Sequence, residues 1–141
     1  MDHVQKKRSF VVYKFKINSI MVDNNNFKKL RKVMSSLGKG LVIKKNEPDY
    51  YYLNTNKKAK DKDMFFGAVQ IRKSYVAYHL FPVYTHPELL DDISDSLKKR
   101  MQGKSCFNFK KEITEEHLNG IAALTTSCYE KYVDVGYIDQ S

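Results

Sequence analysis

Two neighbouring apolar runs, residues 65–72 and 75–84, constrain the fold of this chain more than any other part of its sequence. Both runs are rich in aromatic and β-branched residues, and only Lys73 and Ser74 separate them. They therefore predict two strands joined by a tight turn. Their apolar residues occupy both alternating positions, which is typical of strands covered on both faces. We place this hairpin at the centre of a mainly antiparallel sheet.

The segments around the hairpin indicate an α+β fold. Helical spacing predicts helices at residues 27–37 behind an Asn26 cap, at 87–102, and from the N-cap Thr114 onward. Further short strands are predicted at residues 41–43, 50–53 and 105–109, with a lysine-rich loop at 54–63. The expected domain is a single sheet of about five strands packed by three helices, in the order α-β-β-β-β-α-β-α.

Length and composition indicate one globular domain. The chain has 141 residues, 42% of them hydrophobic, which is enough for one core without a disulfide framework. The two cysteines, Cys106 and Cys128, lack the spacing of a zinc site and are expected to be reduced. No apolar run reaches the length of a membrane span. We expect a cytoplasmic protein that does not engage a membrane, with an oligomeric state that the sequence leaves open.

Residues 1–20 differ from the rest of the chain. They contain five basic residues and one acidic residue, and they show no clear period. We expect them to form an N-terminal extension that is disordered or absent from the native protein, with Met21 as an alternative start and residues 21–141 as the domain. A competing hypothesis is an extra strand, because Phe10, Val12 and Phe15 have high β-propensity.

One group of residues predicts a basic, aromatic pocket. By strand alternation Tyr75 and His79 share a face, and Lys73 precedes them. Lys104 follows Gly103 and enters an aromatic strand, so its backbone is less free than that of most lysines. A small anion would suit such a pocket. No nucleophile or phosphate-loop motif accompanies these residues, which favours a binding domain over an enzyme without deciding the point.

Two other patterns keep alternative functions open. Four carboxylates fall close together in the predicted second helix and would suit a hard cation: Glu88, Asp91, Asp92 and Asp95. Two basic groups flank Tyr50, Tyr51 and Tyr52, a pattern that would suit single-stranded nucleic acid. These basic residues are Lys28, Lys29, Arg31, Lys32, Lys44 and Lys45, then Lys57, Lys58, Lys60 and Lys62.

Residues 66–84 and 97–109 resemble the YdhG-like family of bacterial domains of unknown function. The shared pattern is a lysine opening a strand that contains a histidine, then a helix, then a Gly-Lys turn into an aromatic strand. The resemblance covers roughly residues 24–133 and implies a frataxin-like architecture, with helices on one face of an antiparallel sheet. It also implies an iron-chaperone role as an alternative function. Frataxin-like iron binding uses an acidic first helix. The corresponding helix here carries four basic residues that repel a cation: Lys28, Lys29, Arg31 and Lys32.

The residues and the resemblance together yield one leading hypothesis. The chain is expected to be a small binding domain without a cofactor, and its partner is a small anion or small molecule or, as an alternative, another protein. Lys73 and Lys104 would supply positive charge and His79 a hydrogen bond. Tyr75 and Phe107 would form the walls of the site.

Overall fold

The computed structural model describes the backbone of residues 2–141 and the side chains of residues 11–141, and Met1 lies outside this description. The strands are β1 (Leu41–Glu47), β2 (Tyr50–Ala59), β3 (Lys62–Ile71), β4 (Val76–Leu80), β5 (Met101–Gln102) and β6 (Cys106–Phe109). The helices are α1 (Asp2–Ser35), α2 (Phe81–Thr85), α3 (Asp95–Lys98) and α4 (Glu115–Asp134), with a 3₁₀ turn η1 (Pro87–Leu90). The predicted α+β class is confirmed.

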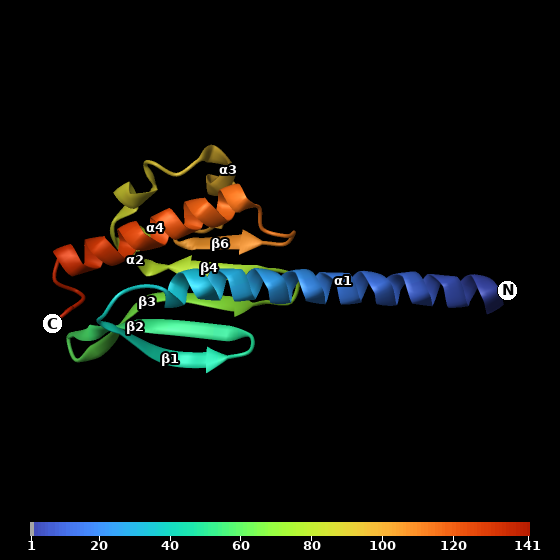
Figure 1. The fold of residues 1–141 in the computed structure, drawn as a ribbon, viewed down its shortest axis with the longest axis horizontal. Coiled ribbons are helices and arrows are strands. Elements are labelled where there is room, and N and C mark those ends of the chain that lie inside the picture. The colour runs from blue at the N-terminus through green and yellow to red at the C-terminus, as the bar shows by residue number, and fades with distance from the viewer. Residues whose placement is uncertain (1) are drawn as a thin grey trace.

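The strands form one antiparallel sheet in the order β1-β2-β3-β4-β6-β5, so the predicted hairpin β3–β4 lies at its centre. Helices α1 and α4 lie over one face of this sheet (Figure 1). Val76, Tyr78 and Leu80 of β4 point into the core beneath them and are fully buried. The residues between them are only half-buried. The expectation that both faces would be covered is therefore wrong, because the second set of apolar residues lines an open face.

Helix α1 approaches the sheet closely at Gly67 of β3. A Cβ atom built at Gly67 would lie 2.9 Å from Met34 Cε of α1 and 2.8 Å from the His79 carbonyl oxygen. Both distances are shorter than ordinary van der Waals contact. Glycine at this position therefore permits the packing of the helix on the central strands.

Asn26 is not the cap of a helix that begins there, because α1 is already helical from Asp2. The side chain of Asn26 is fully buried and ties α1 to the loop before α4. Its Nδ2 donates to the Lys111 carbonyl oxygen at 2.8 Å, and its Oδ1 accepts from the Ile113 backbone N–H at 3.0 Å. A cap would use only the side-chain oxygen of Asn26, as an acceptor, whereas this contact between distant segments uses both its donor and its acceptor.

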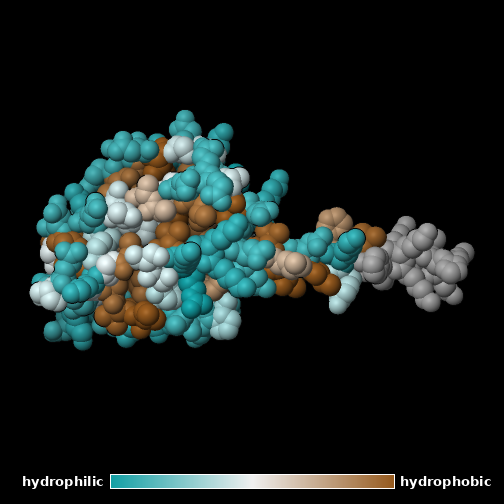
Figure 2. Space-filling view, in the orientation of Figure 1, coloured by the Kyte–Doolittle hydropathy of each residue, from teal (hydrophilic) through white to brown (hydrophobic). Residues whose placement is uncertain are grey.

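Residues 11–21 of α1 form a projecting arm that leaves the body of the domain (Figure 1). The strand alternative for this segment is wrong, since its backbone is helical. Several apolar side chains of the arm are exposed, Phe15 by 71% and Tyr13 by 64%. Figure 2 shows hydrophobic surface on the arm beyond the body. Buried contacts begin just after it, at Asp23. Within residues 2–141 no helix combines the length and apolar character needed to cross a membrane.

Two further segments differ from expectation. Residues 54–63 extend the hairpin β2–β3, which closes at Lys60 and Asp61 with φ angles of 51° and 64°. Such a two-residue turn with two positive φ values matches the twist of a hairpin. The strand predicted at residues 75–84 ends at Leu80, and α2 follows it.

The predicted helix at residues 87–102 is interrupted. Ser94 has an extended backbone, and its Oγ accepts from the Leu97 backbone N–H at 3.1 Å, so it starts the short helix α3 instead of continuing a long one. Met101 then leaves the helix and pairs with Phe107 as part of β5. The sheet therefore has six strands, where about five were expected, and β5 is the additional one.

Replacing Asp23 by asparagine is expected to stabilise the domain at neutral pH. Asp23 is 7% exposed, and its Oδ1 has no hydrogen-bond partner among the described residues. Desolvation raises the pKa of Asp23 above its ordinary value. The ionised form therefore costs folding free energy above the raised pKa, and the cost disappears below pH of about 4, where the unfolded carboxyl is protonated too.

Urea denaturation would measure this effect. Asp23→Asn should raise the free energy of unfolding by about 1 kcal/mol at pH 7 and by much less at pH 3.5. The exposed Asp91→Asn is the matched control, with an expected change below about 0.5 kcal/mol. An Asp23→Asn variant less stable than the parent at pH 7 would contradict the assignment of an unpaired buried carboxylate.

Removing residues 1–20 is expected to leave the melting temperature within about 2 °C of the full chain, because the described side chains of this stretch are exposed. Circular dichroism melts of the two chains would test this. Deletion of residues 137–141 is the control and should lower the melting temperature clearly, since it removes the buried Ile138. A loss above about 5 °C on removing residues 1–20 would show that the arm stabilises the body.

Candidate functional site

The open face of the sheet contains a groove of about 360 Å³, which we call the open-face groove. Its floor is made by two small residues on the central strands, Ala68 and Ala77. Tyr52 and Phe65 form one wall, with stacked rings whose centroids are 4.6 Å apart and whose planes meet at 29°. A hollow forms here because small side chains lie between large ones.

Strand register explains why these residues meet. One row of side chains crosses four strands on the open face in the order Tyr52, Ala68, His79 and Cys106. A second row, two residues along each strand, contains Tyr50, Gln70, Ala77 and Asn108. Successive side chains of a strand point to opposite faces, so residues two apart share one. The groove is thus a direct consequence of pairing the four strands in this register.

His79 adjoins the Phe65 end of the aromatic wall and lies across Ala68 from Tyr52. Its Nε2 is 2.7 Å from Ser105 Oγ, and the Phe65 ring meets it edge-on at a centroid distance of 4.9 Å. Desolvation by the surrounding side chains lowers the pKa of His79 below its ordinary value. The imidazole is therefore mainly neutral at pH 7 and offers hydrogen bonds to a ligand without adding charge.

Arg72 provides positive charge at the groove. Its guanidinium donates to Gln70 Oε1 at 3.2 Å, and within residues 11–141 it forms no ion pair with a carboxylate. Burial raises the pKa of the Cys106 thiol, and the charge of Arg72 opposes that rise. Cys106 is thus a thiol and not a reactive thiolate at neutral pH. The groove supplies a cation, hydrogen bonds and aromatic walls, which suit binding.

The structure separates the two lysines of the sequence hypothesis. Lys73 lies at the exposed turn between β3 and β4, whereas Lys104 lies beside the other end of β4, where Leu80 N–H donates to the Ser105 carbonyl oxygen. Four residue steps along β4 span about 13 Å. Lys104 Nζ is 5.9 Å from the centroid of the Tyr84 ring. The two ammonium groups therefore do not converge on one small anion.

Only His79 of the five predicted site residues lines the groove. Phe107 is fully buried and pairs with Tyr78, so it faces the helices and belongs to the core. Tyr75 closes the β3–β4 turn, where its carbonyl oxygen accepts from Arg72 N–H at 2.8 Å. Sequence reasoning missed Phe65 and Arg72, and it assigned Tyr52 to the alternative nucleic-acid pattern and not to the pocket. Tyr50 and Tyr52 are two residues apart and share one face of the strand, whereas Tyr51 between them points into the core. This alternation is the sequence signal that could have identified the aromatic wall.

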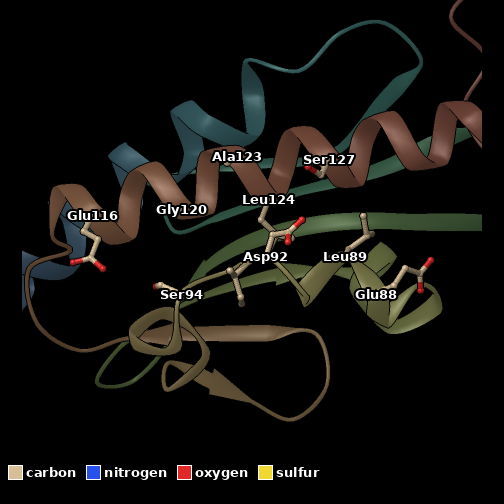
Figure 3. A pocket seen from close by; sticks show the side chains of 10 residues that line it. Glu88, Leu89, Asp92, Ser94, Glu116, Gly120, Ala123, Leu124 and Ser127 are labelled. Carbon is tan, nitrogen blue, oxygen red and sulfur yellow. The ribbon is translucent and has the colours of Figure 1, made fainter.

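The carboxylates considered for a cation do not gather at one point. Glu88 instead pairs with Lys131, with 3.7 Å between Oε1 and Nζ. Figure 3 shows Glu116 and Glu88 at opposite ends of a second groove against α4, with Asp92 between them. Over residues 11–141 no three His, Cys, Asp or Glu side chains come close enough to hold a metal ion. The iron-chaperone alternative gains no support from this geometry.

The first of the two basic groups is itself divided between the two faces of the sheet. Arg31 of α1 stands 5.7 Å from the centroid of Tyr51, which points into the core. Lys45 of β1 lies 4.7 Å from the centroid of Tyr50, on the open face. The tyrosines that the sequence placed between the two groups are therefore divided by strand alternation.

Compared with known proteins, the chain matches no family model, no curated protein and no solved structure. The class that the fold and site define is an α+β domain with one antiparallel sheet, covered by helices on one face and hollowed on the other. The resemblance to the YdhG-like family remains a prediction from the sequence pattern.

Phe107 and Lys104 should differ sharply when each is replaced by alanine. Phe107→Ala removes a fully buried ring and is expected to lower the free energy of unfolding by about 3–5 kcal/mol. Lys104→Ala changes an exposed side chain and should alter it by less than about 0.5 kcal/mol. Urea denaturation measures both. A small effect of Phe107→Ala would contradict its assignment to the core, and Phe107 would again be a candidate ligand contact.

Proposed function

We propose that this chain is a binding domain whose open-face groove holds a small planar molecule with an anionic group. The observation that carries the proposal is the position of Arg72, an arginine without a carboxylate partner among the described residues, at a groove with an aromatic wall. A planar ligand would lie against Tyr52 and Phe65, and its anionic group would meet the guanidinium, which binds carboxylate and phosphate in a bidentate manner.

The dimensions of the groove support a ligand of this size. Its volume of about 360 Å³ lies within the range of small-molecule sites, which combine apolar walls with a few polar groups. His79 and Ser105 add a hydrogen-bonding pair on the side opposite Tyr52. The free thiols of Cys106 and Cys128 support a cytoplasmic location for this proposed function.

Thermal-shift measurements with matched probes would test the proposal. The charged probes are 2-naphthoate and AMP, and their neutral counterparts are 2-naphthamide and adenosine. A ligand at one hundred times its dissociation constant adds about 2.7 kcal/mol of stability. For a chain of this length that is roughly 5–11 °C. We expect the charged probes to raise the melting temperature more than the neutral ones.

Arg72→Ala should weaken binding of the charged probes by roughly tenfold or more, since it removes a charge-assisted hydrogen bond. Arg31→Ala is the matched control, because this arginine contacts Tyr51 on the opposite face of the sheet. Equal losses in the two variants, or no shift with any probe, would count against a ligand site in the open-face groove.

A further inference from the structure

A chain of aromatic rings extends beyond the open-face groove, and we call it the aromatic track. It consists of Tyr50, Tyr52, Phe65, Phe81 and Tyr84, with successive ring centroids 6.0, 4.6, 5.9 and 5.6 Å apart. The first three rings line the groove, whereas Phe81 and Tyr84 lie on α2, beyond it. A ligand that covers the whole track is therefore longer than one that fills the groove.

Each end of the aromatic track carries a lysine. Lys45 Nζ lies 4.7 Å from the centroid of Tyr50, and Lys104 Nζ lies 5.9 Å from the centroid of Tyr84. Arg72 lies between these ends, at the groove. Rings and cations are thus distributed along one surface of a protein whose net charge is +9. An extended partner that matches this surface has planar groups joined by anions.

Acidic groups near the aromatic track do not cancel this charge. Burial raises the pKa of Tyr52 most, and the nearby Tyr50 and Asp63 add to the rise. The carboxylate of Asp63 pairs with Lys44 at 3.6 Å. Glu47 pairs with Tyr50 in the β1–β2 register, and Lys45 lies over the same Tyr50 ring, so this carboxylate has a cation close to it. The positive charge of Arg72 and Lys104 is left for a ligand.

We propose that the aromatic track binds single-stranded nucleic acid, an inference that rests on the proposed function and names its ligand class. Unpaired bases are planar and stack on aromatic side chains, while the phosphates between them meet lysine and arginine. An open antiparallel sheet with aromatic residues is a known geometry for displaying such rings to unstacked bases. A duplex keeps its bases stacked inside and offers only its backbone to the aromatic track.

Fluorescence anisotropy with labelled U8 and dT8 would test this proposal on the full chain at several salt concentrations. Both oligomers should bind more tightly than UMP or TMP, and preference for U8 or for dT8 would identify RNA or DNA as the partner. The logarithm of the affinity should fall with the logarithm of the salt concentration, with a slope of about −0.7 per phosphate contact. A duplex of equal length should bind more weakly.

Variants at two positions outside the groove separate this inference from a small-molecule site. Tyr84→Ala removes a ring that is 52% exposed and should weaken U8 or dT8 binding about tenfold, while leaving the response to 2-naphthoate unchanged. Tyr84→Phe keeps the ring and should retain affinity. Lys104→Ala should reduce the salt slope by about 0.7, whereas Lys32→Ala, on α1, should not change it.

The outcomes distinguish the two proposals. If 2-naphthoate binds at Arg72 but the oligomers bind no more tightly than the mononucleotides, the groove is a small-molecule site and the inference is overturned. If neither class of probe binds, both proposals fail. Heparin, an anionic polymer without aromatic bases, should compete poorly. The inference would also be overturned if heparin and U8 bound equally well and Tyr84→Ala weakened neither. The interaction would then depend on charge alone and not on stacking.

Discussion

The hydroxyl group of Tyr78 lies where the sheet and both long helices meet, and the rest of the structure depends on this junction. Tyr78 is fully buried at the centre of β4, and its hydroxyl lies 2.6 Å from Thr125 Oγ1 of α4. Thr125 donates its own proton to the Ile121 carbonyl oxygen at 2.7 Å, so Tyr78 is the donor in the pair. Met34 of α1 is 4.0 Å away. Both hydroxyl protons of this buried pair are thus donated in hydrogen bonds. A fully satisfied polar pair of this kind fixes how β4, α1 and α4 are arranged.

The direction of Tyr78 has a consequence on the other side of the sheet. Because neighbouring side chains on a strand point to opposite faces, burying Tyr78 places Ala77 and His79 outward. The register then sets His79 opposite Ala68 of β3, and Ala68 opposite Tyr52 of β2. The same pairing that closes the core thus builds the groove, without any residue dedicated to shaping it. Core packing and the candidate site are coupled through one register.

Several local features of the structure follow from the sequence because they depend on near neighbours. The N-cap is an example: Thr114 Oγ1 accepts from the His117 backbone N–H at 3.1 Å, as the motif predicts. The tight turn at Lys73 and the central place of β3 and β4 were also predictable. Asn26 shows the limit of such local prediction. Its side-chain amide forms hydrogen bonds with backbone groups of a loop far away in the sequence, and not with the start of its own helix. Ser94 illustrates it again, because one side chain decided between one long helix and two short segments.

The candidate site was less predictable than the fold. Apolar residues occupy both sets of alternating positions in the central hairpin, and this pattern predicted a layer of structure on each face of the sheet. On one face these residues, such as the aromatic Phe65, instead remain half-buried and form the open face. His79 was found from its place among apolar residues, yet its partner Ser105 and the nearby Arg72 come from other segments. Lys73 and Lys104 looked equivalent in sequence but lie beside opposite ends of β4.

The sequence by itself determined the α+β class, the antiparallel central hairpin, the basic character of the chain and the last helix, because periodicity, turn residues and caps act over a few neighbouring positions. Only the tertiary structure decided which face of the sheet the helices cover. That choice buried Phe107 and left Tyr52 half-buried on the open face, although both are aromatic residues in strands. The physical reason is that side-chain direction depends on register and on the packing partner, and both are set by residues far apart in the chain.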